Sequence, residues 1–288
     1  MSLELKDGFC IISDTQRTSL LEFWRERNQK ERVLLVQEIA RRKPSFLLHL
    51  GDLVFNASSP SDWSQFDQLF SPIWQAGIPV LPIMGNHEYW GNPTRGHRNF
   101  FARFPQLKDR FWYHRKAGSL GLLCLDGNKE KMPTEKWKQQ CLWFREQLQL
   151  MQDDTGLRGI LVFIHHPPYT NSTVTKDEKH VKEDVVPPFL GTPKCMGLFS
   201  GHVHSYERFQ RAGKLFSVVG GGGGPRVRLL QGKRRRHLDD LFSGGGLRPF
   251  HFLHLFETKK GLDVQVVGLK KGTSDFFIMD TYSMPWPK

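Results

Sequence analysis

The sequence contains no apolar run that approaches the roughly 20 residues needed to cross a bilayer. Its start also lacks a basic segment followed by a long apolar stretch, which is the pattern of a secretory signal. We therefore expect a soluble protein that does not bind membranes. Its compartment stays open: the periplasm or the exterior if a leader has been removed, and the cytoplasm otherwise.

Cysteine is scarce, with four residues in 288 and no Cys-x-x-Cys pair, which argues against a zinc ribbon or a thioredoxin-like motif. Cys10 and Cys124 lie inside apolar runs that resemble strands. We expect all four, which also include Cys141 and Cys195, to be buried thiols rather than disulfide partners.

Acidic residues are fewer than basic ones, 29 against 41, so the formal net charge is +12. This charge favours anionic partners. The densest basic cluster, residues 228–237, could be a solvated loop or a contact for phosphorylated substrates or nucleic acid. Because we find no stripe of alternating basic and aromatic residues of the kind that binds single strands, nucleic acid is not favoured.

Strand-like and helix-like patterns alternate through the first two thirds of the chain, which favours an α/β sheet. Strands are predicted over residues 8–14, 46–51, 78–84, 120–126, 160–165 and 197–201. Amphipathic helices are predicted over residues 18–42, 61–74 and 134–151. After Gly201 the pattern changes to short strands with glycine-rich turns, including a hairpin around residues 259–261. No Pro/Ser-rich linker divides the chain, so we expect one domain over residues 1–288.

A run of five glycines, Gly220 to Gly224, lacks the Lys-Ser/Thr of a phosphate-binding loop. We interpret it as a tight turn where the backbone passes close to another group. The alternative is that its amides face a substrate phosphate.

Five apolar runs end at residues that bind metals or transfer protons. They stop at Asp14, at Asp52, at residues 86–88, at residues 165–166, and at the pair His202 and His204. In α/β proteins the carboxyl ends of strands are where sites assemble. The pattern therefore predicts one functional site at these strand ends.

In chain order, the stretches SDTQ, GDLVF, GNHE, HHPP and GHVH resemble the five sequence blocks of calcineurin-like metallophosphoesterases. GHVHSYER and HHPPY are similar to the purple-acid-phosphatase branch, and the resemblance spans residues 13–208. It implies a four-layer α/β/β/α sandwich of two mixed sheets flanked by helices. It also implies a metal-dependent phosphatase that hydrolyses phosphomonoesters by in-line attack of a metal-bound hydroxide.

A carboxylate shared by two metal ions can hold them roughly 3.5–4 Å apart, and Asp52 is the candidate bridge. By the family pattern, Asp14, Asp52 and His204 bind the first metal. The second metal is held by Asp52, Asn86, His165 and His202. Carboxylate, amide and imidazole ligands without thiolate suit two iron, manganese or zinc ions better than calcium or magnesium.

His87 is the candidate general acid, because an imidazole can donate a proton to the departing alkoxide near neutral pH. Glu88 could hold the His87 ring by a hydrogen bond. Gln16, Glu88 and His166 are further candidates for metal binding or for a place directly behind the metal ligands.

Two positions depart from the family pattern. Gln16 stands where the family has histidine or, in purple acid phosphatases, glycine, so we expect the first metal to be held loosely or through water. Phe55 replaces the tyrosine that binds ferric iron in purple acid phosphatases and has no donor oxygen in its side chain. We therefore expect neither a purple protein nor a ferric first site.

Candidate substrate-binding residues follow GNHE: Arg95, His97 and Arg98, with Tyr89 and Trp90 as contacts for an aromatic leaving group. The expected partner is a small phosphorylated molecule, and the oligomeric state stays open. The alternatives are a phosphodiesterase or nuclease, and a metal-binding scaffold with weakened catalysis. The argument against the scaffold alternative is that every metal-ligand position other than Gln16, and the general-acid position His87, carries the residue that the family pattern requires.

Overall fold

A computed structural model describes residues 3–19, 24–242 and 244–287 of the chain. It contains two mixed sheets of six strands each. The first has the order β12-β11-β10-β1-β2-β3, formed by Phe276–Pro285, Gly261–Leu269, Phe250–Glu257, Phe9–Ile12, Leu47–His49 and Val80–Pro82. The second has the order β4-β5-β6-β7-β9-β8, formed by Tyr113–Ala117, Leu120–Leu125, Gly159–Ile164, Cys195–Ser200, Lys214–Val219 and Tyr206–Arg211.

The two sheets pack face to face. Along the buried strands, alternate side chains point into the core between the sheets and into a second core beneath the helices. In β5, Leu122 and Cys124 belong to the core between the sheets, whereas Leu123 and Leu125 belong to a second core with Phe144 of helix α5 (Thr134–Asp153). On the outer face of the first sheet, helix α1 (Gln29–Arg42) packs Leu35, Val36 and Ile39 against the strands.

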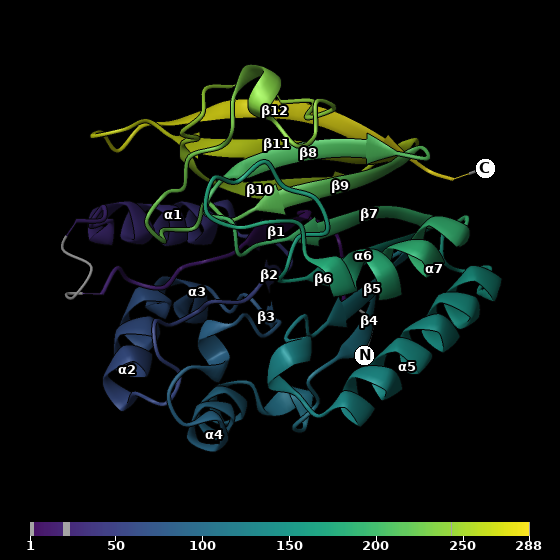
Figure 1. Cartoon of the computed structure of the whole chain (residues 1–288), viewed down its shortest axis with the longest axis horizontal. Coiled ribbons are helices and arrows are strands. Elements are labelled where there is room, and N and C mark those ends of the chain that lie inside the picture. The colour runs from purple at the N-terminus through teal and green to yellow at the C-terminus, as the bar shows by residue number, and fades with distance from the viewer. Residues whose placement is uncertain (1–2, 20–23, 243, 288) are drawn as a thin grey trace.

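Helices cover the outer faces of both sheets. Figure 1 shows α5, α6 (Lys179–Asp184) and α7 (Val186–Gly191) on one side of the molecule. Helices α1, α2 (Pro60–Leu69) and α3 (Ser71–Gln75) lie on the other side. The predicted α/β/β/α architecture is confirmed. The remaining helical segments are α4 (Pro93–Arg103) and the 3₁₀ turns His87–Tyr89, Pro105–Leu107, Lys129–Lys131 and Gly232–Arg234.

Two predicted helices differ in extent from those in the structure. The helix expected over residues 18–42 begins only at Gln29. Directly before it, the side chain of Asn28 donates hydrogen bonds to the carbonyls of Gly223 and Gly224. Residues 20–23 of the expected range lie outside the described residues. The helix expected over residues 61–74 is divided into α2 and α3. Pro72, at the start of α3, has no N–H to continue the preceding helix, which explains the break.

The predicted strands are present, and the hairpin is formed by β10 and β11. Strands β4 and β8 were not predicted. Both are outer strands of the second sheet, and their partly exposed, charged sequences do not form the continuous apolar runs of the central strands.

All four cysteines are free; three are buried, and Cys141 is partly exposed. Among the described residues, no helix is both long and apolar enough to pass through a bilayer.

Candidate metal centre

Five parallel strands bring the predicted site residues together. Strands β1, β2 and β3 are parallel neighbours in one sheet, and β6 and β7 are parallel neighbours in the other. Because the sheets stack, the carboxyl ends of these strands lie beside one another. Asp14, Asp52, Asn86, His165, His202 and His204 all follow these ends within a few residues.

Two clusters of ligand atoms form there, and both include Asp52. In the first, atoms of Asp14, Asp52 and His204 lie within 4.8 Å of one another, and in the second the same holds for Asp52, His165 and His202. Asn86 joins the second cluster, since its Oδ1 lies 2.8 Å from His202 Nδ1 and 3.2 Å from His165 Nε2. Each cluster could hold one metal ion.

Backbone carbonyls orient two of the imidazoles. The Nδ1–H of His165 donates to the Leu50 carbonyl at 2.7 Å, and the Nδ1–H of His204 donates to the Pro225 carbonyl at 2.8 Å. Nε2 of each ring then faces a carboxylate: His165 faces Asp52 at 3.4 Å, and His204 faces Asp14 at 3.4 Å. Metal-binding histidines characteristically donate their other ring N–H in this way.

The clusters stabilise positive charge. Although burial opposes protonation, the Asp52 carboxylate raises the pKa of His165 to about 10. Burial similarly opposes ionisation of Asp52, yet the charge of His165 holds the pKa of this carboxyl well below its ordinary value. Burial, together with the charge of His165, lowers the pKa of His202 to about 4, so this ring is neutral and can act as a ligand.

The turns that carry the ligands are constrained. Asp14, Asp52 and His202 have left-handed backbones, with φ of 58°, 56° and 65°. Such values are uncommon outside glycine and collect at functional sites. Gly85 has no room for a side chain, because a Cβ there would collide with Asp52.

Glu88 supports the Asp52 turn. Its buried carboxylate accepts hydrogen bonds from the backbone N–H groups of Asp52, Leu53 and Gly85, at 2.8, 2.9 and 2.7 Å. The prediction that Glu88 holds the His87 ring is therefore wrong. Burial and the charge of Asp52 raise the pKa of Glu88 to about 8, so added positive charge at the clusters would favour its ionised form.

The His87 ring is held instead by the backbone carbonyl of Phe55. The identity of residue 55 could not predict this contact, because every residue has such a carbonyl. The Nδ1–H of His87 donates to the Phe55 carbonyl at 2.6 Å, which leaves Nε2 facing Asp52 at 3.7 Å. Trp90 lies over the His87 ring with centroids 3.7 Å apart, and the Phe55 ring meets Trp90 edge-on. Trp90 is 40% exposed, so this aromatic wall borders solvent beside the clusters.

Comparison with known proteins agrees with this geometry. The sequence model of the family described as calcineurin-like phosphoesterase matches residues 9–206, more than half of the chain. The chain belongs to the calcineurin-like phosphoesterase family.

Its similarity to individual members is distant. Over 192 residues it is 26% identical to purple acid phosphatase 1 of Ipomoea batatas, covering 62% of this chain and 40% of that protein. The chain spans between 40% and 49% of the length of the first three curated relatives.

Solved structures of this phosphoesterase fold cover nearly the whole chain. A dimetal phosphatase from Danio rerio superposes with a TM-score of 0.63 at 14% identity, covering 97% of this chain and 98% of that one. GAP50 of Plasmodium, described as the anchor in the inner membrane complex, superposes with a TM-score of 0.68 at 14% identity, covering 97% and 89%.

Gln16 reaches the first cluster of this phosphoesterase site. Its Nε2 lies 3.2 Å from Asp52 Oδ2 and 3.1 Å from His204 Nε2, while its Oε1 is buried without a hydrogen-bond partner in the part of the chain that the structure describes. A 180° rotation of the amide would exchange the two atoms and bring an oxygen to the point between Asp52 and His204.

His166 lies beside the second cluster, with its ring 4.7 Å from that of His202. It lines a shallow hollow of about 160 Å³ together with Asn86, Lys129, Lys131 and His180. Its buried Nδ1 has no hydrogen-bond partner among the described residues and packs against Gly127, where a Cβ would collide with it.

The structure does not bring the three predicted substrate-binding residues to the clusters. His97 packs between the rings of Tyr89 and Phe111, at 4.6 and 5.0 Å. Arg95 and Arg98 are exposed on α4, and their side chains have no hydrogen bond or ion pair to any described residue.

The glycine run packs behind the first cluster. The N–H groups of Gly222 and Gly224 donate to the carbonyls of Ser13 and Asp14, at 3.0 and 2.7 Å, and a Cβ on Gly224 would collide with the His204 ring. The close-approach interpretation is confirmed. Because these two amides are already bonded, they do not form a phosphate cradle.

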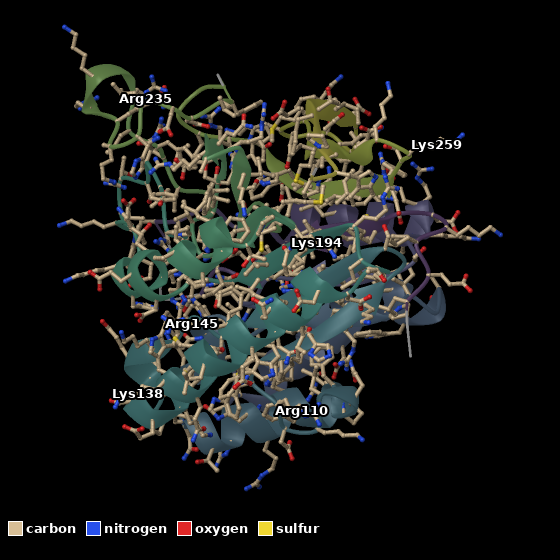
Figure 2. All side chains as sticks on the ribbon, turned by 90° about the vertical axis from the view of Figure 1, so that its right-hand side faces the viewer. Arg110, Lys138, Arg145, Lys194, Arg235 and Lys259 are labelled. Atoms are coloured by element: carbon tan, nitrogen blue, oxygen red, sulfur yellow. The ribbon has the colours of Figure 1, made fainter. Side chains whose placement is uncertain are left out.

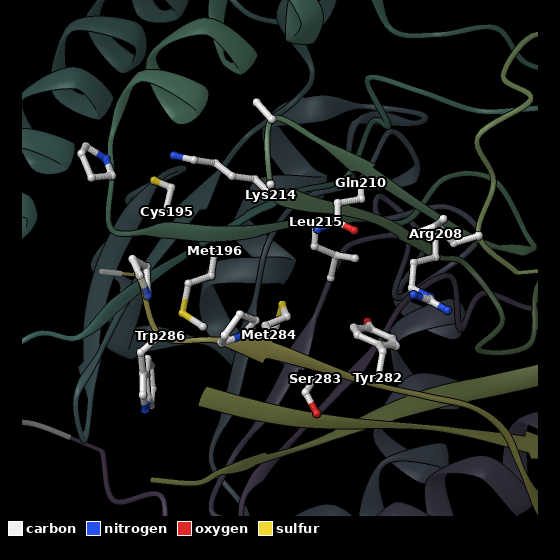
Figure 3. A pocket seen from close by; sticks show the side chains of 16 residues that line it. Cys195, Met196, Arg208, Gln210, Lys214, Leu215, Tyr282, Ser283, Met284 and Trp286 are labelled. Atoms are coloured by element: carbon white, nitrogen blue, oxygen red, sulfur yellow. The ribbon is translucent and has the colours of Figure 1, made fainter. Parts of the chain in front are cut away.

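A different hollow, of about 270 Å³, lies away from this site (Figure 3). Cys195 and Met196, which line it with Met284 and Trp286, are the first residues of β7, whereas His202 and His204 follow the other end of that strand. It is therefore separate from the candidate metal centre.

Proposed function

We propose that the chain is a dinuclear metal-dependent phosphatase that hydrolyses phosphomonoesters of small molecules. The observation that carries this proposal is the pair of ligand clusters that share the Asp52 carboxylate. Asp14, Asp52 and His204 would hold one ion, and Asp52, Asn86, His165 and His202 the other. The donor set fits, because it combines carboxylate and amide oxygens with imidazoles, of which His165 and His204 donate their N–H groups to backbone carbonyls.

Two bound metals would supply a nucleophile at neutral pH and stabilise the charge of the attacked phosphate. The protein's own residues orient the reaction. His87 Nε2 lies at the edge of the shared carboxylate, where it can give a proton to the leaving oxygen, and the Phe55 carbonyl holds the ring in that orientation. Trp90 keeps water from one face of His87.

The hollow beside the second cluster supports a small ester as the substrate. Its volume of about 160 Å³ is below the roughly 300–1,000 Å³ of drug-sized ligand sites. Its lining combines Lys129 and Lys131 with Glu130 and Glu178, and the Lys129 ammonium is paired with Asp184. The scaffold alternative keeps one support: GAP50, a protein of the same fold, is described as an anchor.

We predict that the purified protein hydrolyses p-nitrophenyl phosphate, that a chelator abolishes this activity, and that Mn²⁺, Zn²⁺ or Fe²⁺ restores it. The bis-p-nitrophenyl ester, assayed in parallel, should be the poorer substrate. Faster turnover of the diester would favour the phosphodiesterase alternative. No turnover of either ester with any of these metals would leave the scaffold alternative.

His87 and Asp52 should affect rate and metal content differently. His87→Ala removes a proton donor without removing a ligand, so the two metals should stay while kcat falls by roughly 10²- to 10⁴-fold. Asp52→Asn should lower metal content and activity together. Metal analysis of each variant beside its kinetics makes the distinction, and loss of metal from His87→Ala would contradict the role assigned to His87.

We further propose that the Gln16 amide oxygen completes the first metal site, in place of the weak or water-mediated binding expected from the sequence. Gln16→Ala should then reduce first-site affinity by roughly 10- to 100-fold, the range for groups that support a metal site. Gln16→His should bind at least as tightly as wild type. Calorimetric titration with Mn²⁺ measures this, with Gln149→Ala, an exposed glutamine on α5, as the control. Unchanged first-site affinity in Gln16→Ala would remove Gln16 from the site.

A further inference from the structure

A second region of the molecule combines aromatic and basic side chains. Residues 110–115 read Arg-Phe-Trp-Tyr-His-Arg, and the last three of them belong to the outer strand β4. This segment differs from the alternating stripe considered in the sequence analysis, because its aromatic residues are contiguous and lie between two arginines. Of these aromatic rings, Tyr113 is buried, whereas Phe111 and Trp112 are partly exposed.

Helix α5 adds side chains to the same region. Lys136 Nζ lies 4.5 Å from the centroid of the Phe111 ring, and His114 stacks on Trp143 at 6.2 Å with an angle of 13° between the rings. Lys136 and Trp143 are seven residues apart, so they lie on one face of the helix. The region is thus assembled from two segments that are distant in the sequence.

Two adjoining hollows mark this surface. One, of about 440 Å³, is lined by Phe111, Trp112, Lys136 and Trp143, and the other, of about 710 Å³, continues toward Lys108. Both are also lined by Arg110 and Arg115. Each is large enough for a nucleotide-sized ligand. We call the two together the β4 groove.

The charge of the β4 groove is positive. Its lining residues include five cations, Arg103, Lys108, Arg110, Arg115 and Lys136, against one carboxylate, Asp109. Arg103 is bound to Asp67, but Arg110 has no side-chain partner in the portion of the chain that is described. Burial, followed by the charges of Arg115, Lys116 and Arg110, lowers the pKa of His114, which reflects the same positive field.

We propose that the β4 groove binds single-stranded nucleic acid. Proteins that hold single strands combine cations that follow the phosphate backbone with aromatic rings on which bases stack. Trp112 and Trp143 would supply stacking surfaces, and Arg110 and Lys136 would contact phosphates. An alternative explanation is that basic residues on an outer strand prevent it from pairing with strands of other proteins. This would explain Arg115, but it would not explain the partly exposed Trp112 and Trp143.

The groove is a separate site from the metal centre, and this inference does not depend on catalysis. The residues that line the β4 groove include none of the candidate metal ligands, and the rings of Tyr89, His97 and Phe111 pack between the two regions. Binding can therefore be measured with a chelator present and no hydrolysis taking place.

The test is fluorescence anisotropy with a fluorescein-labelled oligothymidylate of about 20 nucleotides, in chelator, at two salt concentrations. Wild-type protein should bind, and Trp112→Ala should weaken binding by roughly 5- to 150-fold, the loss of one stacked base. Arg110→Glu should weaken binding and lower its dependence on salt. Because Arg110 is exposed, this variant should fold like wild type.

Arg234→Glu is the matched control, since it makes the same charge change in the densest basic cluster of the sequence. Figure 2 shows its neighbour Arg235 and Arg110 at opposite ends of the molecule. The control should bind within twofold of wild type. The proposal is wrong if no binding occurs at the lower salt concentration, if Arg234→Glu weakens binding as much as Arg110→Glu, or if correctly folded Trp112→Ala binds like wild type. Hydrolysis of p-nitrophenyl phosphate by Trp112→Ala should equal that of wild type, whatever that rate is.

Discussion

A carboxylate buried without compensating positive charge is unfavourable by several kcal/mol, and Asp52 is buried in the turn that follows β2. The surrounding structure is arranged around this constraint. His165 and Gln16 both face Oδ2 of Asp52, and the backbone N–H of His87 donates to Oδ1 at 2.9 Å. Glu88 holds the turn that carries Asp52 but adds a second buried carboxylate. The site therefore favours positive charge. Without metals, this charge is the proton on His165, and bound metal ions would supply it instead.

The fold supplies the positions for this arrangement. Parallel strands in both sheets end at one edge, and the turns that follow them place a carboxylate or imidazole in a left-handed backbone conformation at Asp14, Asp52 and His202. Such conformations are maintained only where the surroundings hold them. Here Gly85, and the backbone N–H of His202 donating to Asp14 at 3.0 Å, provide that support. The geometry of the clusters is thus determined by backbone packing as well as by the ligand side chains.

Much of this could be predicted from the sequence, because central strands are continuous apolar runs and the polar residues that end them are distinctive. The outer strands β4 and β8 could not, since half-exposed strands mix charged and aromatic residues. The support of His87 was also hidden, because it comes from a backbone carbonyl, that of Phe55, and any residue has one. The contact of Gln16 with His204, 188 positions away, could not be predicted either, because it depends on how the sheets pack. The β4 groove could not be predicted from the sequence, because it forms only where α5 packs against residues 110–115.

The central claim is that two metal ions share Asp52. The most direct measurement is an anomalous difference map from crystals of the wild-type protein grown with Mn²⁺. The account predicts two peaks roughly 3.5–4 Å apart, both within bonding distance of the Asp52 carboxylate. One peak would bind His204 and Asp14, and the other Asn86, His165 and His202. A single peak at saturating Mn²⁺, or a second peak that does not contact Asp52, would contradict the account.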